Sequence, residues 1–363
     1  MEHKKAWPAC RWVSRLAGAS ALMGALAALP AALLAAQIDL HSHSYCSDGI
    51  QTPETMVGAA KQMGLDVYAL TDHDTVACLD RARAKARELG VRLISGIEIS
   101  AEDDSMHILG IGIDPGNSAL SRLLANTSRE RRNRLMAILD KLSRIGAPLD
   151  LEKDILLPKL NFERRLDGLP PVVNSPGVDA LFAQIRGQIT RPDVARALVR
   201  QRYAANSRDA FDRYIGDDAP AGIPLQGPSF AAVIATIHEA GGLAVLAHPY
   251  TISQYKKFPV TYSGRKFKTF EGLARSMLGA GLDGFEAYRS TWEKYPSRVK
   301  RLQKIAANFT AHSGRAVLFT AGSDYHGYSP DDPNRLGGKS LGVPDVPEEA
   351  QAQMIRALRH AAL

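Results

Sequence analysis

The sequence predicts an α/β fold: a distorted, seven-stranded (β/α)7 TIM-like barrel that carries a helical insertion. Two observations indicate the barrel. Short apolar strand signals alternate with helix signals from residue 38 onward, and seven such strands suit a closed or nearly closed barrel better than two separate domains. The stretch 116–228 has no strand signals, which predicts the insertion. The chain has 363 residues, 45% of them hydrophobic, enough for one large domain of this kind.

The first half of the barrel is expected over residues 37–115. A helix begins after Thr52, because this N-cap residue is followed by a proline and then an acid in the first turn, and it should end near Gly64. A second helix is predicted over 76–90, where a glycine closes it. Short apolar runs predict four strands, at 38–40, 65–71, 91–100 and 106–113.

The second half of the barrel is expected over residues 229–363, with the same alternation. Helix signals occur at 229–242, 270–281, 296–312 and from Pro347 onward. Strand signals occur at 243–248, 282–288 and 316–323. Because helices separate these short buried strands, we expect a parallel sheet.

The intervening residues 116–228 form the predicted helical insertion domain. Strong amphipathic patterns predict helices over 128–146 and 191–201, and a proline- and glycine-rich loop lies between them at 166–177. The two halves of the barrel are therefore expected to be separated by a helical unit of their own chain.

Residues 1–36 differ from everything that follows. A cationic start precedes an uncharged, alanine- and leucine-rich stretch over 16–36, which has the form of a secretory signal peptide, with a small-residue cleavage pattern at 25–27. A translation start assigned too far upstream, with Met23 as one alternative, or an uncleaved helix would give the same pattern. A membrane-spanning helix fits less well, because glycine and proline interrupt the stretch.

Charge and cysteine content narrow the possible classes. The formal charge is +7, and residues 1–36 account for +3 of it, which leaves a mildly basic remainder. The three cysteines, Cys10, Cys46 and Cys78, are irregularly spaced and support neither a disulfide scaffold nor a cysteine zinc site. Cys46 is best interpreted as a surface or packing cysteine.

Candidate metal ligands occur where the predicted strands end. In a barrel, side chains at the carboxyl ends of strands gather on one face. His41 and His43 follow the first strand, and residues two apart along an extended chain point the same way. The complete set of imidazoles and carboxylates at strand ends is His41, His43, Asp48, His73, Glu98, His107, His248, Asp324 and His326. His3, His238, His312 and His360 lie elsewhere and are assigned no chemistry.

The ligand types indicate which metals fit. Nitrogen and oxygen donors without thiolates suit manganese, iron or zinc, and more than four candidates imply more than one ion. A carboxylate such as Glu98 can bridge two of them. Asp39 and Asp72 lie close to ligand histidines in the sequence. Each could orient an imidazole or form hydrogen bonds at the strand end, and the sequence favours neither role.

At this point the motifs resemble those of the PHP (polymerase and histidinol phosphatase) superfamily. The segments "DLHSHSYCSDG", "LTDHDT", "GIEIS" with "HILG", "AHP" and "GSDYHG" occur in the order that the superfamily shows. The resemblance covers 37–115 and 229–330. It implies a seven-stranded barrel, a trinuclear metal centre and the nine ligands named above, none of which is substituted, so an active hydrolase is expected.

The insertion resembles the ribonuclease AM and nucleoside 3',5'-bisphosphate phosphatase branch, through "ERRNR", "ITRPDVARALV" and "FDRYI". Members of that branch remove mononucleotides from RNA 5' ends or dephosphorylate nucleotides such as pAp. The resemblance would place five arginines near substrate phosphates: Arg131, Arg132, Arg134, Arg191 and Arg196. A solvated helix face paired with Glu130 and Asp140 is the alternative. Asp193 stands where the branch has histidine, and "GDDAPAG" (216–222) replaces a basic turn.

These comparisons of motifs set the functional expectations. We expect a Mn²⁺-dependent phosphoesterase with two or three ions per chain, Fe²⁺, Zn²⁺ and Mg²⁺ being alternatives, which acts on nucleotides or short RNA 5' ends. The alternatives are a phosphatase of the histidinol-phosphate type and a non-catalytic metal-binding module. We expect no stable nucleic-acid partner and no membrane span in the mature domain. The expected compartment is the cytoplasm, with export to the periplasm as the alternative; the oligomeric state is open.

Overall fold

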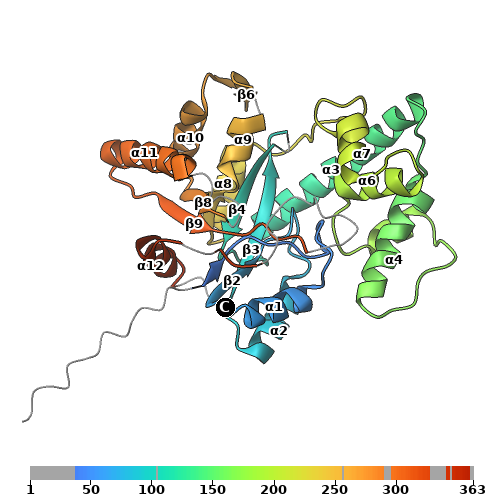
Figure 1. Cartoon of the computed structure of the whole chain (residues 1–363), viewed down its shortest axis with the longest axis horizontal. Helices are drawn as coiled ribbons and strands as arrows, with labels where there is room; N and C mark the ends of the chain where they lie inside the picture. The colour runs from blue at the N-terminus through green and yellow to red at the C-terminus, as the bar shows by residue number, and fades with distance from the viewer. Residues whose placement is uncertain are drawn as a thin grey trace, which may run out of the picture. The chain divides into compact units, whose positions relative to one another are not determined.

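The computed structural model describes residues 37–103, 105–255, 257–289, 296–327, 341–343 and 346–359 (Figure 1). These residues belong to one compact unit, which spans Ala36–Leu363. The signal-like segment 1–36 lies outside the described residues, so the expectations about it stay predictions. Within the described ranges, no helix combines the length and the apolar character needed to cross a membrane.

A seven-stranded sheet forms the centre of the fold, and all seven predicted strands are present. Their order in the sheet is β1-β2-β3-β4-β5-β8-β9. An isolated parallel bridge between Ser42 and Tyr325 joins the two edges, so the sheet is nearly closed, as expected. The strands are β1 (Ile38–Asp39), β2 (Val67–Leu70), β3 (Leu93–Ala101), β4 (Met106–Ile111), β5 (Leu243–Leu246), β8 (Gly284–Tyr288) and β9 (Leu318–Ala321).

The expectation of an all-parallel sheet was wrong for β4, which pairs antiparallel with both β3 and β5. Only residues 102–105 connect β3 to β4. A parallel pair needs a crossover of roughly a dozen residues or more, whereas so short a link permits only a hairpin. The other pairs, β1 with β2, β2 with β3, β5 with β8 and β8 with β9, are parallel.

Helices cover the barrel at the predicted places. Thr52 caps the first of them, since its side chain accepts a hydrogen bond from the Thr55 N–H. The barrel helices are α1 (Pro53–Gln62), α2 (Leu79–Leu89), α8 (Phe230–Glu239), α9 (Pro249–Tyr255), α10 (Phe270–Gly279), α11 (Pro296–Ser313) and α12 (Glu348–Ala357). The sequence analysis missed α9 and the small hairpin β6 (Val260–Tyr262) and β7 (Arg265–Phe267). The two hairpin strands have three residues each, too short for a periodic signal.

The insertion is helical, and no strand occurs in residues 116–228, all of which are described. Its helices are α3 (Ser118–Arg144), α4 (Leu157–Leu166), α5 (Val178–Gln184), α6 (Arg191–Arg200) and α7 (Ser207–Ala210), with π-helical turns η1 (Leu151–Leu156) and η2 (Phe211–Ile215). Leu120 near the start of α3 packs into the barrel core, while Leu135 and Leu142 join a second hydrophobic cluster that the insertion builds for itself. The exact domain boundaries stay a prediction.

One expectation about the cysteines was wrong. Cys46 and Cys78 are both buried and form a disulfide, with their Cα atoms 6.2 Å apart. A single pair separated by 32 residues has no spacing signature, so the sequence could not reveal it. The bond joins the loop after β1 to the N-cap of α2.

Candidate metal centre

The fold brings all nine predicted ligands to one rim of the barrel. Those that follow β1, β2, β5 and β9 sit just past the strand ends, while Glu98 and His107 lie within the β3–β4 hairpin and point to the same place. A parallel bridge between His73 and Glu98 brings the end of β2 next to β3. His107 lies in the antiparallel strand β4 of a hairpin, and its side chain still points to the face that the other ligands share.

Glu98 lies at the middle of the cluster, and its two oxygens face different partners. The Oε2 atom is 3.1 Å from a ring nitrogen of each of His41, His43 and His73. The Oε1 atom is 2.9 Å from His248 Nε2 and 3.1 Å from His107 Nδ1. A fully buried carboxylate in this position is arranged as a bridging ligand would be.

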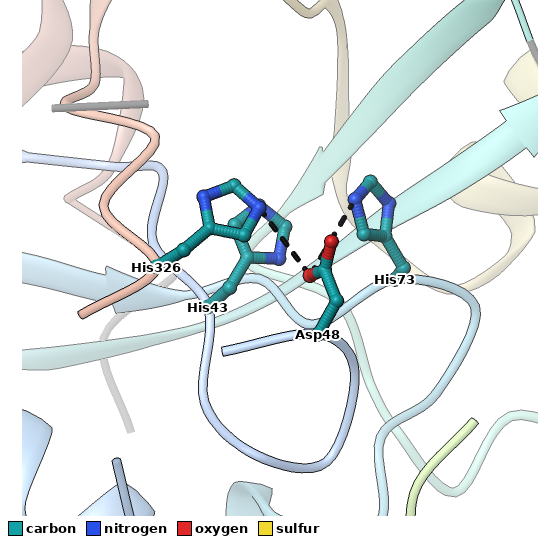
Figure 2. A group of neighbouring side chains, drawn as sticks. All are labelled: His43, Asp48, His73 and His326. Atoms are coloured by element: carbon teal, nitrogen blue, oxygen red, sulfur yellow. Dashed lines mark ion pairs between the residues drawn. The ribbon is translucent and has the colours of Figure 1, made fainter. Parts of the chain in front are cut away.

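A second part of the cluster surrounds Asp48 (Figure 2). Asp48 Oδ1 is 3.3 Å from His326 Nε2 and 4.0 Å from His73 Nε2, and His43 and His326 stack with their ring centroids 4.2 Å apart. Asp324 completes the opposite side, where its Oδ1 is 3.2 Å from His43 Nε2 and 3.3 Å from His41 Nε2. His43 thus belongs to both parts.

Eight of the nine candidate ligands, all except His248, fall into three overlapping groups whose donor atoms lie within 4.8 Å of one another. The groups are His41 with His43, Glu98 and Asp324; His43 with Asp48, His73 and His326; and His73 with Glu98 and His107. Within the described residues, His73 Nδ1 and Glu98 Oε2 are buried and have no hydrogen-bond partner. Buried polar atoms are rarely left in that state, so the donor set fits divalent cations.

The protonation states of the cluster fit metal binding as well. Burial would lower the pKa of His43, but the nearby carboxylates of Asp324 and Glu98 outweigh it and raise the pKa to about 9. Burial lowers the pKa of His73 to about 3, so this ring is neutral. Burial would raise the pKa of Glu98, but the neighbouring His73 and His41 bring it well below its ordinary value. Without a metal ion, a proton on His43 balances part of the negative charge of the carboxylates. A divalent cation would displace that proton and supply the positive charge instead.

Two residues that the sequence analysis missed support the ligands. Glu286 in β8 is fully buried; its Oε1 is 2.8 Å from His41 Nδ1, and its Oε2 accepts the His248 N–H at 2.7 Å. Arg289 donates to Asp324 at 2.5 Å. Burial would raise the pKa of Asp324, but the charge of Arg289 outweighs it and lowers the pKa well below the usual range. An acid within the apolar strand "GFEAY" was the available signal for Glu286.

Asp39 and Asp72 do not hydrogen-bond directly to an imidazole of the cluster; Asp72 reaches His43 only through the Ser47 hydroxyl, which is 3.3 Å from His43 Nδ1. Asp72 accepts hydrogen bonds from the backbone N–H and hydroxyl of Ser44 and from the Ser47 hydroxyl, all within 2.8 Å. Asp39 accepts from the backbone N–H groups of His41, Ser323 and Gly342. Both aspartates therefore fix the strand-end backbone, which was the second of the two open roles, and Glu286 holds the imidazole of His41.

The backbone around the ligands is unusual at three places. His248 and Asp324 have φ values of 29° and 55°, a region that side chains other than glycine seldom adopt. At Gly322 a Cβ atom would collide with Glu286 Oε1 and with His41, so only glycine allows this close approach. Such features persist where the surrounding structure enforces them, which is typical of functional sites.

The insertion holds the loop between His43 and Asp48. Lys159 of α4 is buried, and its Nζ donates to the carbonyls of Tyr45 at 3.1 Å and Ser47 at 3.0 Å. The carbonyl between them, that of Cys46, accepts the Gln188 N–H at 2.9 Å. A Cβ atom at Gly187 would lie 2.7 Å from that same carbonyl oxygen. Three successive carbonyls of the loop are therefore bound by the insertion.

The five arginines predicted to meet substrate all have partners within the protein. Arg131 is buried and donates to Asp74 and Ser100, and Arg134 is buried and donates to the Ile223 carbonyl. These two are turned to internal acceptors because a buried cation needs them. The other three also form ion pairs: Arg132 with Asp179 at the surface, half-buried Arg191 with Asp217, and half-buried Arg196 with the buried Asp193. A role in substrate binding stays a prediction for all five.

Comparison with known proteins extends these findings. A model of the PHP domain matches residues 39–167. A 5'-3' exoribonuclease of Haemophilus influenzae is 34% identical over 245 residues, which are 67% of this chain and 79% of that protein. A 3',5'-nucleoside bisphosphate phosphatase of Chromobacterium violaceum is 29% identical over 86% of this chain and 94% of its own length. A crystal structure described as a metal-dependent phosphoesterase of Bifidobacterium adolescentis has a TM-score of 0.61 and 30% identity, and covers 87% of this chain and 95% of that one.

Proposed function

The chain belongs to the PHP domain family, and on this premise we propose that it is a metal-dependent phosphoesterase of nucleotides. It would act as a 5'-3' exoribonuclease on short RNA, as a nucleoside 3',5'-bisphosphate (pAp) phosphatase, or as both; one named relative is a 5'-3' exoribonuclease and the other a 3',5'-nucleoside bisphosphate phosphatase. The observation that carries the proposal is the cluster of nine imidazoles and carboxylates around Glu98, because a protein that had lost the activity would have no reason to keep every donor in place.

We propose that the cluster holds two or three Mn²⁺ ions, with Fe²⁺, Zn²⁺ and Mg²⁺ as alternatives. The three overlapping donor groups support more than one ion, and mixed nitrogen and oxygen donors without thiolate suit these metals. Such ions, when bound, activate a water molecule near neutral pH and stabilise charge on phosphoryl oxygens.

The protein's own side chains would prepare that chemistry. Glu98 offers Oε2 to His41, His43 and His73 and Oε1 to His107 and His248, so it would link these two sets of rings. Glu286 accepts from His41 Nδ1, which leaves Nε2 as the metal-facing nitrogen of that ring. Arg289 keeps Asp324 ionised and adds a positive charge at the rim, where a phosphate would lie.

We also propose the domain division of 37–115 with 229–363 for the barrel and 116–228 for the insertion. The separate hydrophobic cluster of the insertion supports it. RNA as a substrate favours the cytoplasm, whereas the Cys46–Cys78 disulfide and the signal-like segment favour the periplasmic alternative. Sequencing the mature N-terminus from fractionated cells would decide between them.

The proposed function is tested with purified protein in Mn²⁺ or in chelator. The substrates are pAp, a 5'-phosphorylated oligoribonucleotide and histidinol phosphate. Metal-dependent release of mononucleotides from RNA, or of phosphate from pAp, is the expected result. Turnover of histidinol phosphate alone would replace the proposal with a small-molecule phosphatase. No turnover by a protein that retains its metal would indicate a non-catalytic module.

A further inference from the structure

The segment 257–315 has the highest density of positive charge in the chain. Residues 257–315 contain 12 Lys and Arg against 4 Asp and Glu, a net charge of +8, whereas the whole chain carries 45 against 38. With the +3 of residues 1–36 also set aside, the rest of the chain is net −4. Within that remainder the insertion 116–228 is itself net +5, with 18 Lys and Arg against 13 Asp and Glu, so the segment 257–315 is the more strongly basic of two basic regions.

Most cations from the small hairpin to α11 are exposed, and we call these exposed cations the basic face; Arg289 of the same segment is buried. Arg265 of the small hairpin donates to Ser276 of α10, and Glu271 of α10 pairs with Arg301 of α11 at 2.6 Å, so the three elements adjoin. Among the described residues of the segment, no acid is exposed. The exposed members of the basic face are Arg265, Lys266, Lys268, Arg275, Lys300, Arg301 and Lys304.

A shallow groove runs between α10 and α11 on this face. Three cations, Arg275, Arg301 and Lys304, line it against the single acid Glu271, together with Ile305 and Asn308. Its volume of about 240 Å³ is smaller than the pockets that enclose small ligands, roughly 300–1,000 Å³. An open groove with excess positive charge suits a segment of a polyanionic backbone better than an enclosed metabolite.

The first turn of α11 lies beside the segment that carries the candidate ligand His248. Arg289 at the end of β8 contacts Asp324, and α11 starts seven residues later in the chain. The guanidinium of Arg298, in the first turn of α11, lies 5.4 Å from the ring of Tyr250, two residues beyond His248. From Arg301 to Asn308 the helix advances by roughly 10 Å, at about 1.5 Å per residue. Figure 1 shows α10 and α11 on one side of the sheet and α4 and α6 on the other.

We propose that the basic face binds the sugar-phosphate backbone of a single-stranded RNA whose 5' end occupies the metal centre. This inference rests on the proposed function and deepens it, because it favours RNA over the mononucleotide pAp as the substrate that the protein is built to hold. Cations spaced along α11 give affinity without base recognition, since phosphate contacts carry no sequence information.

An anionic membrane is the other polyanion that such a face could meet, and the structure favours RNA. Helices that lie in a membrane interface insert large apolar side chains beside their cations. In α11 the apolar Leu302, Ile305 and Ala306 are buried in the barrel core. The exposed large hydrophobics of the described residues all lie outside the segment 257–315.

The test compares two doubly substituted proteins. Arg275→Glu/Lys304→Glu reverses two exposed cations of the groove, and Arg122→Glu/Arg129→Glu makes the same charge change at two exposed positions of α3, away from the basic face. Binding of a fluorescein-labelled 20-nucleotide RNA is measured by anisotropy in EDTA over a range of salt. Because no turnover is needed, this measurement stands even if the protein proves to hydrolyse neither RNA nor pAp.

The groove variant should bind the 20-mer at least tenfold more weakly at low salt. The slope of log affinity against log salt concentration should become less negative by about 1.4, which is about 0.7 for each of the two lost phosphate contacts. In Mn²⁺ its KM should rise for the 20-mer and stay within twofold for pAp. Equal weakening by the α3 variant, or unchanged RNA binding by the groove variant, would overturn the proposal. So would loss of binding to phosphatidylglycerol vesicles with RNA affinity intact.

Discussion

The two basic regions that flank the metal centre use their cations in different ways. In the insertion, Lys159, Arg131 and Arg134 are buried and donate to acceptors inside the protein. On the basic face, the cations are exposed and few acids accompany them. The insertion has the more conspicuous arginine-rich sequence, "ERRNR", yet two of its three arginines are buried against internal acceptors; most other cations of the insertion are exposed.

The difference teaches that positive charge must be weighed against nearby acceptors before it is assigned to a substrate. Taking a cation out of water costs several kcal/mol unless carboxylates or carbonyls replace the water. Arg131 meets that requirement with Asp74, and Lys159 meets it with two carbonyls of the ligand loop. A cation in such a position cannot also bind a phosphate without abandoning its partner.

The largest effect is expected at the metal centre, where both RNA and pAp would be hydrolysed. His43→Ala and Asp324→Ala should each lower kcat/KM by more than about 10³-fold, since loss even of a residue that only orients a ligand costs about 10–100-fold. The loss should be the same for pAp and for RNA. Metal content by mass spectrometry should fall in parallel. Full activity in both variants would show that the candidate site is wrong.

A large effect on stability is expected for a buried insertion cation. Arg131→Ala leaves the fully buried Asp74 carboxylate without its guanidinium, which should cost about 3–5 kcal/mol of unfolding free energy. Urea denaturation measures it. Arg131→Ala/Asp74→Asn should recover part of the loss. A change below about 1 kcal/mol, the range of surface pairs, would mean that this arginine is not structural.

A moderate effect is expected at the lysine that holds the ligand loop. Lys159→Met removes the donor to Tyr45 and Ser47, so Asp48 should be less well positioned and metal affinity should fall about 10–100-fold. Titration with Mn²⁺ should show a higher requirement, with kcat largely restored at saturation. Lys153→Met, at an exposed lysine of the same insertion, is the matched control. Equal metal affinity in the two variants would argue against the role of Lys159.

The smallest effect is expected at an exposed insertion cation. Arg132 pairs with Asp179 and lies over Phe182, and surface pairs contribute about 0–1 kcal/mol. Arg132→Ala should therefore change KM for RNA by less than about threefold, well below the tenfold expected for the groove variant. A larger increase in KM would restore this arginine to substrate binding and weaken the contrast between the two regions.

The sequence by itself determined the seven strands, the helices with clear caps and the nine donors at the rim. Each of these features is indicated by residues that are close together in the sequence: an apolar run, a cap followed by proline, or a histidine at the end of a strand. His41 and His43 could be paired because alternation along a strand is a local property. That these donors lie together follows from strand ends meeting on one face; that they bind metal stays a prediction.

Only the tertiary structure decided which partners these residues have. The antiparallel β4, the disulfide between Cys46 and Cys78, and the contact of Lys159 with Ser47 join positions whose pairing no local pattern records. The same holds for Glu286, which meets His41 across 245 residues of chain. Packing decides whether a cation is buried against an acceptor or exposed to solvent. That packing brings together segments that lie far apart in the sequence.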